Sequence, residues 1–263
     1  EVASGDNDII FVAGESYAVG ISLKDGQALI GAPTGLTVGG VELIAPSAIR
    51  PTITDALGDG VRLAATAEIR GLAIENTAGD GIHGNAVTQT IIDDVTLLNT
   101  GGQGIDLGNT NPAGPVEITI TGSSIIGISD FSNTPIGIDI QVGGAGGGVA
   151  QVLIDDNAIG LVPVGVFLAV GGTTGTGVDG ANTLTLTNNT ISDFDDDGVQ
   201  IEPDDTAVSS IVLSNNTIDG IDLLAGATPV RGVDFRVRTS VGGSTALTMQ
   251  NNIIRDSELA CAN

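Results

Sequence analysis

Short runs in which apolar and polar residues alternate recur along the whole chain. The segments 116–120 (VEITI) and 184–187 (LTLT) are two of them. A period of two is typical of a β-strand with one buried and one exposed face. Glycine interrupts every stretch that could hold an apolar period of 3.6 residues, so the pattern predicts strands and no sustained helix.

One repeated unit is a glycine followed by Ile or Val, a variable residue and usually a second large apolar residue. Successive copies begin 21 to 34 residues apart. The copies start at Gly60, Gly104, Gly137, Gly165, Gly198 and Gly232, with a weaker copy at Gly81. A recurring period of this size indicates a repeat architecture, in which each repeat is one structural unit.

A second unit, a pair of large aliphatic residues five apart, follows each copy of the first. The pairs are Ile69/Ile74, Ile92/Leu97, Ile120/Ile125, Ile154/Ile159, Leu186/Ile191, Leu213/Ile218 and Met249/Ile254. Positions i and i+5 of a continuous strand face opposite sides, so a short turn must separate the two members of each pair. The later repeats share an asparagine in that gap, at Asn157, Asn189, Asn216 and Asn252. Asparagine tolerates the left-handed conformation, and stacked asparagines can hydrogen-bond to one another and to the turn backbone.

Each repeat therefore reads as one coil of an all-β solenoid, with parallel strands stacked about 4.8 Å apart. We expect seven to nine coils in one domain: N-terminal coils in 1–58, regular repeats in 59–254 and a C-terminal tail in 255–263. The first members of the seven pairs, from Ile69 to Met249, should lie in one buried row.

These units resemble the right-handed parallel β-helix repeats of the pectate-lyase-like superfamily. The opening segments 8–12 (DIIFV), 20–26 (GISLKDG) and 29–31 (LIG) are similar to the first coils of its exported bacterial members. The resemblance implies the fold, and it is compatible with polysaccharide lyases, glycoside hydrolases, tailspikes and repeat regions of surface adhesins. The polygalacturonase-type motifs Asn-Thr-Asp and Arg-Ile-Lys are absent from the sequence.

The net charge of the chain restricts the classes of partner that it can bind. The formal net charge is −24, with 32 acidic residues against eight Lys and Arg. Such a chain repels the phosphates of nucleic acids and anionic membrane surfaces, so we expect neither DNA, RNA nor lipid as a partner, and it attracts divalent cations. No apolar run reaches the roughly 18 residues of a membrane span, and the chain opens at Glu1. We therefore interpret it as a mature or excised segment of an extracellular or cell-surface protein.

The sequence contains few of the residues from which disulfides, zinc sites and phosphate-binding loops are built. A single cysteine, Cys261, allows no internal disulfide, and one histidine, His83, excludes a zinc site of the usual Cys/His type. No glycine-rich phosphate loop is present, because its Lys-Ser/Thr ending is missing. Calcium is the only cofactor that the sequence suggests.

If the glycine units stack in register, their third residues form an outward row that contains His83, Asp106 and Asp139 on successive coils. Neighbouring carboxylates at strand spacing could act as acid and base, which makes these three the catalytic hypothesis. The alternative is an ordinary polar face, which every solenoid needs.

A second cluster is rich in carboxylates, the ligands that calcium prefers. Its members in this hypothesis are Asp195, Asp196, Asp197, Glu202, Asp204 and Asp205. A solvated turn is the alternative interpretation.

Two functions stay open at this point. The first is an extracellular structural or adhesive module that is stabilised by calcium. The second is a polysaccharide lyase or hydrolase, although Phe167 is the only evident aromatic platform for a sugar. Only nine residues follow Ile254. We therefore expect a further domain, or a second subunit stacked end to end, to cover the last coil.

Overall fold

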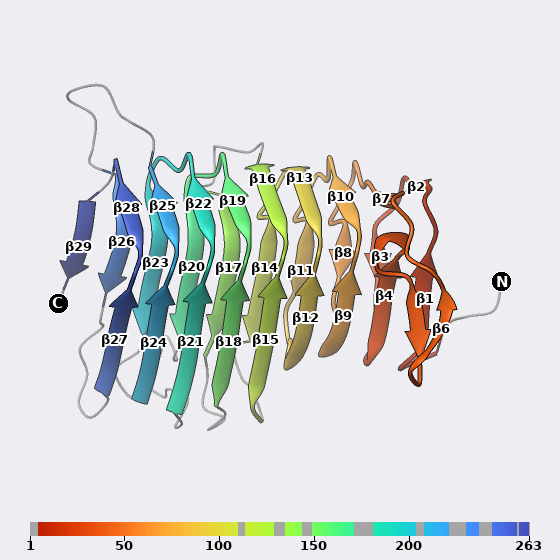
Figure 1. The fold of residues 1–263 in the computed structure, drawn as a ribbon, viewed down its shortest axis with the longest axis horizontal. Coiled ribbons are helices and arrows are strands. Elements are labelled where there is room, and N and C mark those ends of the chain that lie inside the picture. The colour runs from red at the N-terminus through yellow and green to blue at the C-terminus, as the bar shows by residue number, and fades with distance from the viewer. Residues whose placement is uncertain are drawn as a thin grey trace.

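A computed structural model shows an all-β molecule in which coils of strands stack into a rod (Figure 1). The structure describes residues 5–109, 114–128, 135–143, 149–170, 181–203, 208–220, 230–236, 244–256 and 258–262. Within these ranges the helical structure is one 3₁₀ turn, Ala32–Thr34. No helix in the described ranges is long and apolar enough to cross a membrane.

Three parallel sheets run the length of the rod, and each contains nine strands in the described part of the chain. Sheet A contains β1 (Ile9–Val12), β4 (Gln27–Gly31), β9 (Thr66–Arg70), β12 (Gln89–Asp93), β15 (Val116–Thr121), β18 (Ala150–Asp155), β21 (Ala181–Thr187), β24 (Val208–Ser214) and β27 (Ser244–Gln250). Sheet B contains β2 (Ser16–Tyr17), β7 (Thr52–Ile53), β10 (Ala73–Glu75), β13 (Thr96–Thr100), β16 (Ser124–Ile128), β19 (Ala158–Gly160), β22 (Thr190–Ser192), β25 (Thr217–Asp219) and β28 (Ile253–Arg255). Sheet C contains β3 (Ile21–Ser22), β8 (Val61–Arg62), β11 (Ile82–Gly84), β14 (Ile105–Asn109), β17 (Ile136–Val142), β20 (Val164–Val170), β23 (Asp197–Pro203), β26 (Arg231–Arg236) and β29 (Glu258–Ala262).

Each coil contributes one strand to each sheet, and the strands pair in the expected register. The first members of the aliphatic pairs are direct partners across sheet A, from Ile69 to Met249. The second members are partners across sheet B, from Ile74 to Ile254. The predicted alignment and the parallel β-helix are therefore confirmed, and the row is buried from Ile69 to Leu213, whereas Met249 is partly buried.

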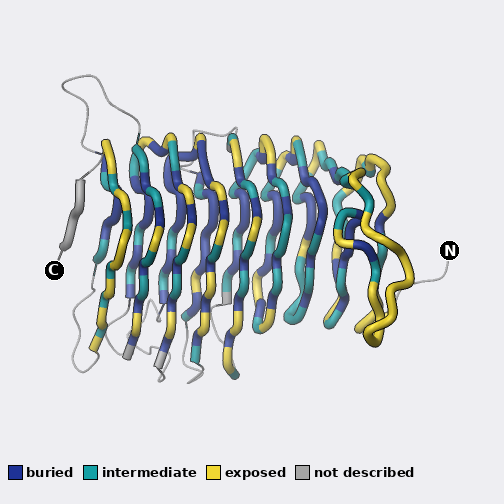
Figure 2. The backbone as a smooth tube through the Cα atoms, viewed as in Figure 1, coloured by how far each residue is buried: buried dark blue, intermediate teal, exposed yellow. Residues whose placement is uncertain are grey.

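The core is a continuous aliphatic column inside the coils, visible as repeated buried stripes in Figure 2. Ile120, Ile154, Leu186 and Leu213 are fully buried, each stacked on the same position of the next coil. In the last coil Met249 is only partly buried, as are Leu247 and Ile254. The end-to-end association expected from the sequence stays a prediction.

An asparagine ladder joins the turns between sheets A and B. Asn189 accepts hydrogen bonds from the backbone N–H and side-chain Nδ2 of Asn157, and its own Nδ2 donates to Asn216. The predicted stacking is therefore present, and Ser123 extends the ladder by one coil. The left-handed residue is the preceding one, however, with φ of 57° at Asn188. The ladder asparagines thus serve the turn through their side chains and not through an unusual φ.

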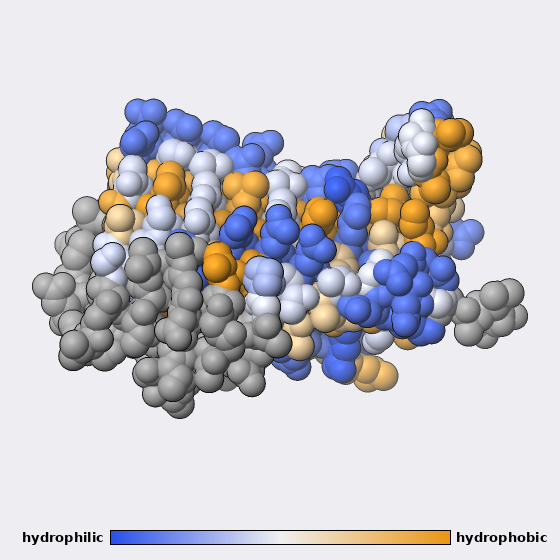
Figure 3. Space-filling model, turned by 90° about the horizontal axis from the view of Figure 1, so that it is seen from below, coloured by the Kyte–Doolittle hydropathy of each residue, from blue (hydrophilic) through white to orange (hydrophobic). Residues whose placement is uncertain are grey.

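The N-terminal coils contain an antiparallel hairpin that the sequence reasoning did not predict. Strands β5 (Leu36–Val38) and β6 (Val41–Ile44) flank Gly39 and Gly40, both at positive φ. Figure 3 shows apolar side chains gathered at this end of the rod. The exposed large apolar residues of this region are Ile9, Val19, Val38, Val41, Leu43, Ile44, Ile49 and Leu57.

The segment 255–263, which we expected to form a tail, contains strand β29. This strand pairs in parallel with β26, so that Cys261 is the register partner of Phe235. The solenoid therefore continues into this segment and adds a ninth strand to sheet C.

Candidate functional site: a polar row on sheet C

A row of outward-facing residues crosses sheet C at the second position after each repeated glycine. Backbone pairing makes each member the direct partner of the next. The row consists of Arg62, His83, Asp106, Asp139, Phe167, Gln200 and Asp234. The sequence hypothesis that His83, Asp106 and Asp139 lie on successive coils is consistent with this register.

A second polar row lies beside its N-terminal part, at the positions directly before Gly60, Gly81 and Gly104. Asp59 Oδ1 accepts a hydrogen bond from the backbone N–H of Asp80 (2.9 Å), and Asp80 Oδ1 accepts one from the N–H of Gln103 (2.7 Å). A Cβ at Gly102 would stand 2.3 Å from Asp80 Oδ1, so a glycine there leaves room for the carboxylate. Each aspartate is thereby fixed by the next coil and directs its other oxygen toward the first row.

His83 lies between two of these carboxylates. Its Nδ1 is 2.9 Å from Asp80 Oδ2 and 3.0 Å from Asp106 Oδ2. Burial raises the pKa of Asp106 above its usual range, and the charge of Asp80 raises it further, while His83 partly offsets both effects. The region is therefore strongly anionic, with one imidazole at its centre.

Asp139 is an almost fully enclosed carboxyl group of the first row, with 2% of its surface exposed. Nε2 of Gln103 donates to it at 3.1 Å, and Nε2 of Gln141 donates to both of its oxygens. Burial raises the pKa of Asp139 to about 6, although these two amides lower it. Gln103 Oε1 is itself buried and has no hydrogen-bond partner within the described residues.

Replacing Asp139 by asparagine is expected to stabilise the protein at pH 7. The raised pKa means that, between about pH 4 and 6, the unfolded chain releases a proton that the folded chain retains, so wild-type stability falls as pH rises through this window. Asp139→Asn removes this penalty, which amounts to about 3 kcal/mol at most. Urea denaturation with EDTA should show variant and wild type equal near pH 3.5 and the variant more stable at pH 7. A constant difference across this range would contradict the assignment.

A second charged cluster occupies the same face near β23 and β26. Asp197 and Asp234 are buried and paired with arginines: Arg231 contacts both, Arg236 Nη1 lies 3.3 Å from Glu202, and Asp196 also contacts Arg231. Burial raises the pKa of Asp197 to about 6, and with the charges of neighbouring aspartates it outweighs the attraction of the arginines.

These ion pairs involve several of the residues that the calcium hypothesis for 195–205 names as ligands. Three of its residues, Asp196, Asp197 and Glu202, pair with arginines, and Asp195 is exposed. Asp204 and Asp205 lie outside the described residues. Calcium binding here stays a prediction. It would need further ligands in addition to the described residues.

Phe167 separates the two charged clusters. It is the register partner of Asp139 on one side and of Gln200 on the other, and it is partly exposed. The face thus offers hydrogen-bonding groups on both sides of one aromatic ring.

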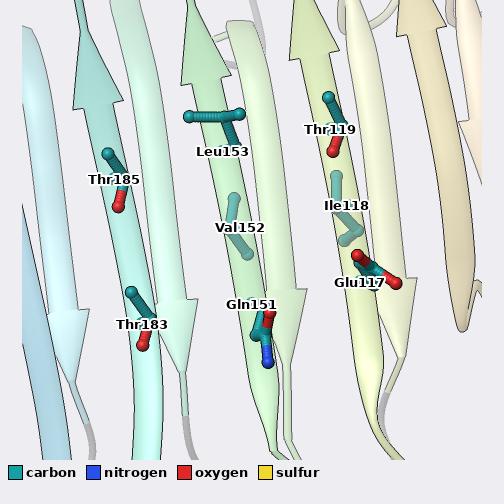
Figure 4. Close-up of a pocket in the computed structure, with 8 residues that line it drawn as sticks. All are labelled: Glu117, Ile118, Thr119, Gln151, Val152, Leu153, Thr183 and Thr185. Atoms are coloured by element: carbon teal, nitrogen blue, oxygen red, sulfur yellow. The ribbon is translucent and has the colours of Figure 1, made fainter.

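Sheet A carries a different surface feature, a groove of about 390 Å³ across β15, β18 and β21. Figure 4 shows its outward side chains, which are Glu117, Thr119, Gln151, Leu153, Thr183 and Thr185. Three of these six outward side chains are threonines and one is aliphatic, and the groove lacks the histidine and the arginines of sheet C. It can therefore serve as a control surface when binding to sheet C is tested.

The sequence reasoning missed Asp59, Asp80, Gln103 and Gln141. The first three share the position directly before a repeated glycine, and Gln141 stands four residues after one. Alignment of the repeats by their glycines would have placed the first three in one row.

Comparison with known proteins agrees with the architecture. No curated protein and no solved structure matches the chain. Residues 59–262, well over half of the chain, match the family model described as the right-handed β-helix region. The chain belongs to the right-handed β-helix family.

Proposed function

We propose that the chain is a β-solenoid module of an extracellular or cell-surface protein, and that it binds a neutral or amine-bearing polysaccharide along sheet C. The observation that carries this proposal is the outward row from Arg62 to Asp234, which is continuous in register over seven coils. At strand spacing the row is about 29 Å long. A linear polymer is the kind of ligand that matches a long, straight, regular surface.

The chemistry of the row suits sugar hydroxyls. The carboxylate of Asp106 accepts hydrogen bonds, Gln200 both donates and accepts, and the ring of Phe167 provides an apolar platform. Each of these side chains comes from a strand whose position is fixed by pairing on both sides, so the surface is preorganised.

Charge selects among polysaccharides. The chain carries a net charge of −24, and the described sheet C face is dominated by carboxylates. A polyuronate would therefore be repelled at low ionic strength, whereas a neutral glycan or one bearing ammonium groups would not.

The direct test is binding to a panel of cellulose, chitin, xylan, chitosan and polygalacturonate. We expect the protein to bind at least one of the first four polymers and not to bind polygalacturonate. Phe167→Ala should weaken binding roughly tenfold, the equivalent of about 1.4 kcal/mol, while Leu153→Ala in the sheet A groove should leave it unchanged. Loss on Leu153→Ala alone, or selective binding of polygalacturonate, would overturn the proposal.

A second function, acid–base cleavage of the bound glycan, is favoured by one observation. Asp139 is a nearly buried carboxyl group with a pKa of about 6, and it stands beside Asp106 in the glycan-facing row. Such a group holds or releases a proton near neutral pH. The same incubations should be analysed for new reducing ends or unsaturated products, and products that persist with Asp139→Asn would exclude this role.

A further inference from the structure

We infer that Asp59, Asp80 and His83, completed by Asp106, form a binding site for a divalent transition-metal ion at the N-terminal part of sheet C. The inference does not depend on glycan binding. It concerns a different ligand and a different set of residues from the calcium hypothesis for 195–205.

The geometry brings the ligand atoms together. One ligand atom each from Asp59, Asp80 and His83 lies within 4.8 Å of the others. Nδ1 of His83 is 2.9 Å from Asp80 Oδ2 and 3.0 Å from Asp106 Oδ2. The two His83 distances match the separation of neighbouring donor atoms around one octahedral ion bound at about 2.0–2.2 Å.

The proton count is the second observation. An imidazole nitrogen carries at most one proton, yet Nδ1 of His83 stands within hydrogen-bond distance of two carboxylate oxygens. A cation at the centre would satisfy all three atoms at once. It would also offset the negative charges of the two carboxylates that approach His83.

The carboxylates are oriented as metal ligands usually are, by hydrogen bonds from outside the site. Backbone N–H groups of Asp80 and Gln103 hold one oxygen each of Asp59 and Asp80. The remaining oxygen of Asp59 contacts Arg62, whose side chain is 62% exposed and free to swing into solvent. Asp59 can therefore exchange the arginine for an ion without a change in the backbone.

The donor set indicates the class of ion. One nitrogen with carboxylate oxygens suits Zn²⁺, Mn²⁺ or Co²⁺, whereas calcium takes six to eight oxygens. The side chains of His83 and Asp106 are about one quarter exposed, so that solvent can reach the site. An ion here would keep open positions for water or for a hydroxyl group of a ligand.

The test uses tag-free protein stripped with EDTA and titrated with Zn²⁺ by calorimetry and with Co²⁺ by visible absorption. We expect one ion per chain and Co²⁺ bands typical of a nitrogen- and oxygen-ligated ion. His83→Ala and Asp80→Asn should each weaken binding at least tenfold and remove those bands. Cys261→Ser and Asp195→Asn are the matched controls and should leave both readouts unchanged.

Circular dichroism separates a lost site from a lost fold, because His83 and Asp80 are partly exposed and outside the aliphatic core, so both variants should retain the wild-type spectrum. Should either variant misfold, Asp106→Asn replaces it with the same expectation. No saturable Zn²⁺ binding by wild type, unaltered binding by His83→Ala, or binding that disappears with Cys261→Ser would each overturn the inference.

Discussion

Replacing Asn189 by alanine is expected to lower the free energy of unfolding by about 4 kcal/mol, because buried polar groups that lose a partner each cost about 1–3 kcal/mol. The side chain of Asn189 makes four hydrogen bonds, two as acceptor from Asn157 and two as donor to Ile154 O and Asn216 Oδ1. Alanine would leave the N–H of Asn157 and the carbonyl of Ile154 without these partners inside the molecule.

Urea denaturation followed by circular dichroism measures the effect, and the neighbouring position supplies the control. Asn188 has a left-handed backbone and an exposed side chain, so Asn188→Gly keeps the turn and should change stability by only a few tenths of a kcal/mol. Equal effects of the two substitutions would show that the ladder hydrogen bonds contribute little.

Gly165→Ala is expected to be similarly damaging, with a loss of about 3 kcal/mol or more from overpacking and backbone displacement. A Cβ at this position would stand 2.4 Å from Cγ2 of Ile191 and 2.5 Å from the carbonyl oxygen of Gly198. The second contact is with backbone, and that backbone belongs to the next coil. The spacing of the coils would have to change to relieve it.

Gly114→Ala is the matched control, since a Cβ there meets nothing within 4 Å. It should leave the denaturation midpoint unchanged. If Gly165→Ala does not accumulate in soluble form while Gly114→Ala does, the yields give the same ranking. Indistinguishable midpoints would show that the recurring glycine is not required by coil spacing.

The architecture was predictable because two independent signals repeat together. The glycine units and the aliphatic pairs alternate, and their alignment fixes which residues become neighbours. Ile154 and Leu186, for example, are register partners because both open an aliphatic pair. In a stacked solenoid, sequence repetition converts directly into contact.

The candidate site was only half predictable, for a geometric reason. Asp80 and His83 are three residues apart, and in a regular strand such positions face opposite sides. In the structure they contact each other at 2.9 Å, because the chain turns at Gly81 before β11 begins. Alternation therefore identified His83 and Asp106 but gave no reason to place Asp80 beside them.

Two other differences have local causes. The hairpin β5–β6 was missed although Val38-Gly39-Gly40-Val41 carries the usual signal of a two-residue turn, because it interrupts the coil period. The left-handed conformation was expected at Asn189 but occurs at Asn188. Both residues are asparagine, so the sequence does not distinguish the left-handed turn residue from the residue that forms the ladder.

The direction of the inter-coil hydrogen bonds has a mechanical consequence. In this rod the covalent chain runs around the axis, and the backbone hydrogen bonds of all three sheets run along it. A pulling force applied between the two ends would load those bonds in tension and separate coils one after another, at low force and with stepwise extension. Compression or bending would instead be resisted by every stacked aliphatic residue at once. A module of this kind is suited to hold a surface at a distance, and it would yield coil by coil when that surface is pulled away.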